Sequence, residues 1–379
     1  MSAPCSPTAP DTEAVRIGLF GIGLDTYWPQ FAGLKKRLEG YLARVAAKLS
    51  RPGVEIVNLG LVDNPDHARE AGREFRRADV DLIFLHVTTY ALSSTVLPVV
   101  RRAKVPVVVL NLAPEPAIDY AAFNALGDRV KMTGDWLAFC AACPVPEIAN
   151  VFQRCGIPFH QVTGVLENDP ACWDEVDAWV DAARVAAGMA RNRLGLMGHY
   201  YGGMLDIYAD VTLQCATFGT HVEMLEVEEL AVLRRAVTDA QIAARVDEFH
   251  RVFEVQPDCP AEDLAAAART AVALDRLVAE HRIGSLAYYH KGSGVEESEA
   301  AIASIILGTS QLTARGIPVA GEYEVKNVQA MKIMDLFGAG GSFTEYYAMD
   351  FMDDVVLMGH DGPGHIAIAE GRTKVRPLG

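Results

Sequence analysis

Basic residues are scarce in this sequence. It has 34 Lys and Arg against 49 Asp and Glu, which gives a formal net charge of −15. Nucleic acids and anionic membrane surfaces bind clustered cations, so we expect neither as a partner. The short basic runs at 35–37, 76–77 and 101–102 are interpreted as solvated helix faces. A small neutral ligand fits this composition better.

Long apolar runs are also absent, and none reaches the length that spans a membrane. Residues 1–14 are rich in Pro, Ala, Ser and Thr and have neither the basic nor the apolar part of a signal peptide. Seven cysteines, an odd number, are scattered over 379 residues, which fits a reducing compartment better than a disulfide framework. We therefore expect a cytoplasmic protein with a disordered leader at 1–14.

Several catalytic motifs are missing. The sequence has no G-x-S-x-G elbow and no Walker-type phosphate loop, so nucleophilic hydrolysis and phosphate-loop chemistry find no support. Gly21 and Gly23 begin a G-x-G-x-x-G pattern, but Thr26 stands where the third glycine is needed. Cys140 and Cys143 form a C-x-x-C pair without a second pair, and we interpret them as cysteines at a helix start.

Short apolar runs alternate with amphipathic stretches from residue 15 onward. This pattern predicts a doubly wound α/β domain with a parallel sheet over 15–168, with ligands beyond the carboxyl ends of its strands. The expected strands are 15–20, 54–59, 82–86 and 105–110, and the expected helices are 31–49, 65–77 and 94–103.

A second α/β domain is expected over 169–316, after the loop 168–170. Its predicted elements are strands at 194–197 and 283–289, a largely helical span at 222–280 and a helix at 301–315. Residues 317–379 then form a segment, with a helix at 327–336, in which carboxylates and imidazoles occur among glycines.

The best candidates for chemistry lie in that last segment. Glu322 follows a short apolar strand, Glu345 follows a Gly-Gly turn, and His360 and His365 flank a turn rich in Gly and Pro. Two hard oxygen donors with imidazole suit a divalent ion such as Mn²⁺. Each residue alone also has an ordinary explanation: Glu322 as a surface acid before a helix, and the histidines as polar surface. His199, beside two tyrosines, is either a pocket wall or part of the core.

Three segments together resemble a known family. They are A-G-E-Y-E-V-K at 320–326, G-S-F-T-E-Y-Y at 341–347 and V-L-M-G-H at 356–360. In order and approximate spacing they resemble the metal-site segments of the L-arabinose and L-fucose isomerase superfamily, closest to its arabinose branch. The resemblance extends from about residue 15 to the C-terminus, and the Glu, Glu, His series is its most specific part.

The resemblance implies a metal-dependent aldose–ketose isomerase, with L-arabinose to L-ribulose as the first substrate pair. Glu322, Glu345 and His360 would bind Mn²⁺, or Co²⁺ or Mg²⁺, and the two glutamates would move the proton between C1 and C2 through an enediol. Met204, Tyr347 and, from its tyrosine-flanked loop, His199 are expected to contact the sugar. The enzyme would be a homo-oligomer with active sites between subunits.

One ligand of the family has no match in this sequence. The resemblance implies that residues 317–379 lead into a β-rich C-terminal domain, which in family members supplies another histidine to the metal. In this chain, His365, a neighbouring subunit or water would complete the metal shell, unless the chain is a truncated or inactive form. The alternatives left open are an L-fucose isomerase type of activity on a deoxyhexose and a non-catalytic sugar-binding or regulatory protein on a similar scaffold.

Overall fold

The computed structural model describes residues 14–377, which divide into two compact units between Ala187 and Gly188. The sequence placed boundaries at 168/169 and 316/317, whereas the division lies inside helix α7 (Pro170–Arg191). The expected leader, apart from Ala14, lies outside the described residues. Within 14–377, no helix has both the length and the apolar character needed to cross a membrane.

The N-terminal unit is built on a parallel sheet of five strands in the order β2-β1-β3-β4-β5, an order common in doubly wound folds. Its strands are β1 (Val15–Ile22), β2 (Val54–Val62), β3 (Leu82–His86), β4 (Val107–Ala113) and β5 (Phe159–Val165). Its helices are α1 (Leu34–Leu49), α2 (Pro65–Arg77), α3 (Leu97–Ala103), α4 (Tyr120–Ala125), α5 (Arg129–Phe139), α6 (Val145–Arg154) and most of α7.

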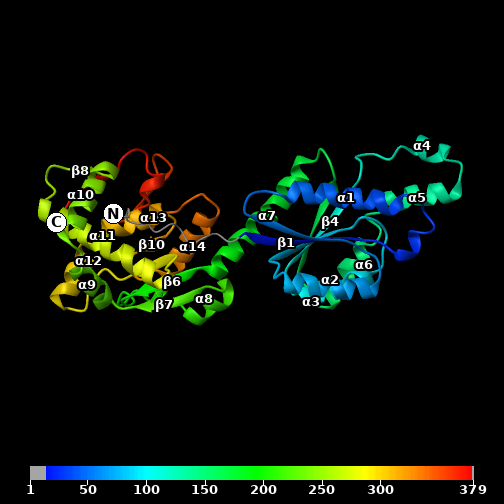
Figure 1. Ribbon diagram of the computed structural model, residues 1–379. Coiled ribbons are helices and arrows are strands. Elements are labelled where there is room, and N and C mark those ends of the chain that lie inside the picture. Colours follow the sequence, from blue (N-terminus) through cyan, green and yellow to red (C-terminus); the bar gives the residue numbers. More distant parts are fainter. Residues whose placement is uncertain (1–13, 378–379) are drawn as a thin grey trace. The chain divides into compact units, whose positions relative to one another are not determined.

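Two apolar cores cover the two faces of this sheet, as the predicted doubly wound α/β class requires. Helices α1 and α7 pack on one face, where α1 buries Leu38, Leu42 and Val45 at helical spacing. Helices α2, α3 and α6 pack on the other face. Figure 1 shows the sheet between these two helical layers.

The C-terminal unit contains a second parallel sheet, with four strands in the order β10-β9-β6-β7. These strands are β6 (Arg193–Met197), β7 (His221–Leu225), β9 (Ser285–Tyr288) and β10 (Val319–Ala320). The helices are α8 (Val211–Phe218), α9 (Val227–Arg235), α10 (Asp239–Val252), α11 (Ala261–His281), α12 (Glu296–Ala303), α13 (Ile306–Ala314) and α14 (Val325–Leu336).

Side chains of the second sheet alternate between two cores. Leu286 and Val319 face the core formed with α9 to α13, while Ala287 and Ala320 face the core formed with α14. Two small sheets complete the unit. An antiparallel hairpin joins β11 (Glu345–Asp350) to β12 (Val355–Gly359), and β8 (Glu254–Val255) pairs in parallel with β13 (Lys374–Val375). In the described chain, the only strands after residue 320 are β11, β12 and β13.

Four local features differ from the predictions. Strand β5 was not expected, and strand β4 starts at Val107 because Pro106 has no N–H for the sheet. The segment 222–280, predicted to be largely helical, begins with residues of strand β7. The helix expected at 301–315 is two helices, and between them the Ser304 hydroxyl donates to the carbonyl of Ala300, a local bond that competes with helix continuation.

Candidate metal centre

The carboxyl ends of β9 and β10 place two polar residues at one edge of the second sheet. These strands are parallel neighbours, with Val319 opposite Leu286 and Ala320 opposite Ala287. Their carboxyl ends therefore lie side by side, which is where α/β sheets bind ligands. His290 comes two residues after β9, and Glu322 two residues after β10.

The backbone at Glu322 is strained. Glu322 and Tyr323 have φ angles of 58° and 62°, a left-handed conformation that costs a non-glycine residue roughly 1–2 kcal/mol. The Tyr323 N–H donates to the Tyr288 carbonyl at 2.8 Å, and the Tyr323 side chain is buried. These contacts hold the turn in place, and consecutive strained residues of this kind concentrate at functional sites.

The β11–β12 hairpin joins the other two candidate ligands. Its register places Glu345 opposite Gly359, and His360 is the next residue after that strand. The hairpin itself therefore brings Glu345 and His360 close together. The pairing also shifts between Tyr346 and Ala348, so Tyr347 is an extra residue in β11. Such a bulge re-aims side chains next to it.

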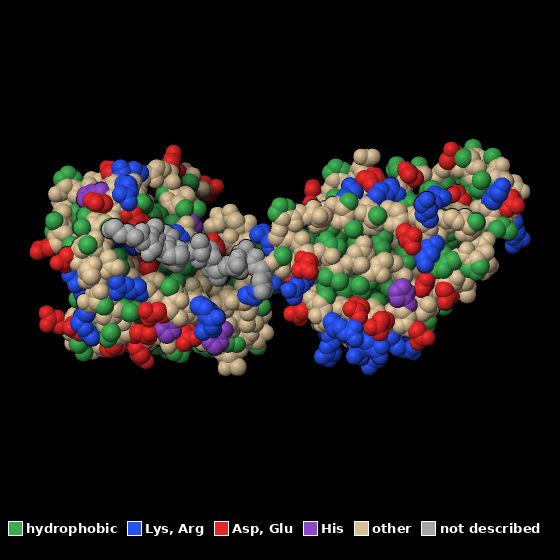
Figure 2. Space-filling view, in the orientation of Figure 1, with side chains coloured by type: hydrophobic (Ala, Val, Ile, Leu, Met, Phe, Trp, Pro, Cys, Tyr) green, Lys and Arg blue, Asp and Glu red, His purple; other side chains and the backbone are tan. Residues whose placement is uncertain are grey.

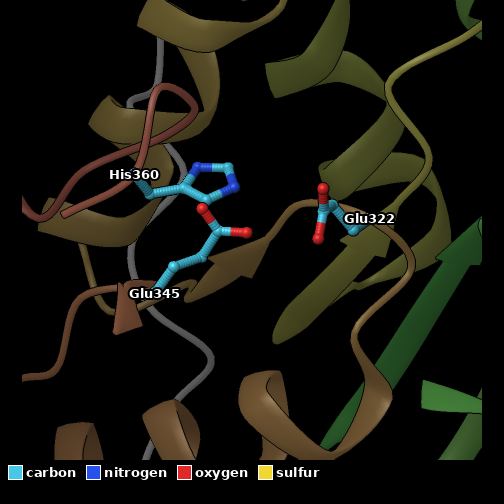
Figure 3. Close-up of side chains that lie close together, drawn as sticks. All are labelled: Glu322, Glu345 and His360. Atoms are coloured by element: carbon cyan, nitrogen blue, oxygen red, sulfur yellow. The ribbon is translucent and has the colours of Figure 1, made fainter. Parts of the chain in front are cut away.

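Glu322, Glu345 and His360 form one group in which a donor atom from each residue lies within 4.8 Å of the other two. Figure 3 shows the two carboxylates and the imidazole directed toward one another from three segments of the chain. Donor atoms at opposite sides of a small divalent ion are about 4.4 Å apart, so small side-chain rotations would bring all three into range. Two oxygens and one imidazole nitrogen are also a donor set that Mn²⁺ accepts.

The His360 ring is oriented by two contacts. Its ring centroid lies 4.3 Å from that of Phe343, and its Nδ1 accepts a hydrogen bond from the Gly362 N–H at 2.7 Å. A neutral imidazole that accepts at Nδ1 carries its proton on Nε2, the nitrogen that Figure 3 shows on the side of the carboxylates. Ligation through Nε2 therefore requires the proton to move to Nδ1 and the Gly362 N–H to turn away.

His290 is a neighbour of this group that the sequence did not single out. Burial lowers its pKa, with the nearby charges of Glu322 opposing and those of Lys291 and His360 adding to the effect. Its ring lies 5.1 Å from that of Tyr201 and 4.6 Å from that of Tyr289. Its place just after the predicted strand at 283–289 was the signal that could have identified it.

Aromatic rings surround the same sheet edge. Tyr347, expected as a sugar contact, lies beside Glu345; partial burial and the charges of Asp361 and Glu345 raise its pKa. His199 follows β6, and its ring lies 4.4 Å from that of Tyr289. Met204 lies further along the same loop, just before a short 3-10 helix at Leu205–Ile207.

His365 lies outside the group of three. Its backbone N–H donates to the Ser342 hydroxyl at 3.1 Å, and its ring packs closely against Gly340. Its buried Nδ1 has no hydrogen-bond partner among the described residues. The structure therefore assembles three of the four expected ligands.

A cavity of about 770 Å³ lies in the C-terminal unit and reaches this region from one side. His360, Asp361 and His365 line it together with Arg234 and Arg376, whereas Glu322 and Glu345 do not. The cavity thus meets the candidate metal centre only at His360.

Comparisons with known proteins found no protein-family model that matches the chain and no curated protein that matches it significantly.

Proposed function

We propose that this chain is a divalent-metal-dependent aldose–ketose isomerase that moves a proton between C1 and C2 of a free sugar. L-arabinose is the first candidate substrate and L-ribulose its product. The observation that carries the proposal is the group of Glu322, Glu345 and His360, with donor atoms within 4.8 Å of one another at a sheet edge. It is also supported by resemblance, because the three segments that contain these residues resemble isomerase metal sites.

The donor set fits an ion of the Mn²⁺ type held by Glu322, Glu345 and His360. When bound, such an ion polarises the sugar carbonyl and so makes the hydrogen on the neighbouring carbon more acidic.

The two glutamates supply the proton transfers. They come from different segments, a sheet-edge turn and a hairpin strand, so they can approach a sugar from two directions. One carboxylate removes the proton from the carbon that bears the hydroxyl and returns it to the adjacent carbon. The other moves the hydroxyl proton between the two oxygens. Geometry of this kind is the main requirement for acid–base catalysis by carboxylates.

Neighbouring side chains would orient the sugar and limit access of water. The rings of Tyr201, Tyr289 and His290 lie against one another beside Glu322. Tyr347 lies next to Glu345, and we propose it as a sugar contact together with Met204 and His199. Flat aromatic faces present few competing hydrogen-bond groups, so they favour the carbon-bearing side of a sugar.

We further propose that the enzyme acts in the cytoplasm as a homo-oligomer with active sites between subunits. The β11–β12 hairpin supports the oligomer, because its side chains are exposed on both strands. Phe351 and Met352, in its turn, are 85% and 93% exposed. Exposed apolar side chains grouped in this way mark surfaces that bind another protein.

The test is ketose formation from L-arabinose, L-fucose, D-arabinose and L-rhamnose, using EDTA-stripped protein with and without added Mn²⁺. We expect Mn²⁺-dependent conversion of one of these sugars. Glu345→Gln should abolish it while the protein stays folded, because Glu345 is exposed and the substitution hardly changes its volume. Glu370→Gln, an exposed acid outside the site, is the matched control and should retain activity.

Two results would contradict the proposal. Turnover that survives Glu345→Gln would exclude the assigned role of that residue. Failure of all four sugars to react with Mn²⁺-loaded protein, with Mn²⁺ binding verified by calorimetry, would exclude this isomerase activity.

A further inference from the structure

A basic pocket lies in the N-terminal unit between helices α2 and α3. It has a volume of about 310 Å³ and is lined by Pro98 and six cationic residues, namely Arg69, Arg73, Arg76, Arg101, Arg102 and Lys104. Figure 2 shows Lys and Arg side chains gathered over these two helices. A cation cluster of this density is unexpected in a chain with a net charge of −15.

The sequence builds the pocket from two separate basic runs. Arg69, Arg73 and Arg76 are spaced by four and three residues, so they form one stripe along α2. Arg101 and Arg102 occupy the last turn of α3, and Lys104 follows directly in a left-handed conformation that ends the helix. Neither run is long enough to indicate a site by itself.

Close packing of the two helices joins the runs. A Cβ atom at Gly72 of α2 would lie 2.8 Å from the Pro98 carbonyl oxygen and 3.0 Å from that of Val99, both in α3. It would also lie 3.1 Å from the Cβ of Arg102. Only glycine at position 72 lets the two helices pack this closely. The close packing places the arginine stripe of α2 beside the cations of α3.

Most of this positive charge is not neutralised. Arg69 pairs with Asp66 and Arg73 with Glu70, the latter at 2.8 Å. By contrast, Arg76, Arg101, Arg102 and Lys104 make no ion pair with any described residue. Cations in the last turn of a helix are favoured by its dipole, which accounts for single residues of this kind. The dipole does not account for four unpaired cations around one pocket, because they repel one another.

We propose that this pocket binds a small multivalent phosphate anion. Arginine guanidinium groups match phosphate oxygens with paired hydrogen bonds, and several arginines around one pocket suit an anion with several charges. The volume of about 310 Å³ fits a short oligophosphate or the phosphorylated end of a metabolite. A long polyanion such as DNA is disfavoured, because the net charge of the whole chain is −15. This binding is independent of the proposed isomerase chemistry.

The experiment measures binding of inorganic tripolyphosphate to the EDTA-stripped protein by titration calorimetry at low salt. We expect saturable binding that weakens as NaCl is raised. The double variant Arg101→Gln/Arg102→Gln should bind at least about tenfold more weakly, since charge-assisted hydrogen bonds are lost. The control Lys36→Gln/Lys131→Gln removes the same charge from exposed positions of the same unit and should bind as the wild type does.

Folding of each variant is verified by tryptophan fluorescence, and Lys104→Gln provides a second, single test at an exposed position. It should also weaken binding. Absence of saturable tripolyphosphate binding to the wild type would overturn the proposal, as would equal weakening in the control. A short DNA duplex that displaces tripolyphosphate at lower concentration would overturn the assignment to a small anion.

Discussion

The strained turn at Glu322 leads to a prediction in which loss of a proposed ligand increases stability. Glu322 has a φ of 58°, and its side chain makes no hydrogen bond or ion pair with another described residue. Glu322→Gly removes the left-handed penalty of roughly 1–2 kcal/mol. Glycine also adds freedom to the unfolded chain, which costs about 0.4–1 kcal/mol. The net expectation is a gain of about 0.5–1 kcal/mol in the free energy of unfolding.

The control is Glu322→Ala, which deletes the same carboxylate but keeps a Cβ and therefore the strain. In EDTA, the glycine variant should be more stable than the alanine variant by about 0.5–1 kcal/mol, or roughly 1–4 °C in Tm for a unit of this size. With Mn²⁺ at about 100 times its Kd, the wild type should gain about 2.7 kcal/mol, whereas both variants should gain much less.

The assay is urea unfolding followed by circular dichroism and by tryptophan fluorescence. All four tryptophans, at 28, 136, 173 and 179, belong to the N-terminal unit, so their fluorescence reports that unit alone. The fluorescence transition should stay unchanged in both variants, while the remaining circular dichroism transition should shift. If Glu322→Gly is no more stable than Glu322→Ala in EDTA, the strain argument is refuted.

Three further predictions concern packing and charge. Gly72→Ala should destabilise the N-terminal unit by about 1–3 kcal/mol, because the added Cβ meets the Pro98 carbonyl. Gly40→Ala, in open space on α1, should instead stabilise the unit by up to about 1 kcal/mol. Unfolding followed by tryptophan fluorescence measures both changes. Burial lowers the pKa of His86 from 6.5 to about 3, so the unfolded chain takes up a proton at a higher pH than the folded chain does. The free energy of unfolding of the N-terminal unit should therefore fall by about 1.4 kcal/mol per pH unit below about pH 6. His86→Leu should remove that slope; an unchanged slope would exclude His86 as its source. Asp275→Asn should cost about 3 kcal/mol in the C-terminal unit, because it leaves two partly buried arginines without their shared carboxylate; a loss below 1 kcal/mol in urea unfolding would contradict this network.

The doubly wound α/β fold could be predicted because its strands are buried on both sides. Strand β3 is buried at all five positions and stands out as an apolar run between turns. Strand β5 escaped prediction for the opposite reason: it is an edge strand, and His160, Gln161 and Thr163 interrupt its apolar residues. Strand β7 also lies at an edge, and its polar residues likewise interrupt the apolar ones, so the sequence predicted it as part of the helical span that follows.

The candidate site was predictable in its residue types but not in its geometry. Glu322, Glu345 and His360 were identified by their glycine-rich settings and by a resemblance, yet periodicity says nothing about how residues far apart in the sequence meet. Strand pairing brings them together, and it also brings in His290, whose proximity depends on β9 lying beside β10. His365 has the same chemistry as His360, but the turn between them determines which ring faces the carboxylates.

The hairpin register has a consequence for how this chain can change. Because side chains alternate along a strand, one residue inserted in or deleted from β11 or β12 would turn Glu345 or His360 to the opposite face. Changes of length are therefore compatible with the three-residue group only in the turn at 351–354, or as compensating pairs across the two strands. Related sequences that keep all three residues should vary in length at that turn and preserve the extra residue at Tyr347.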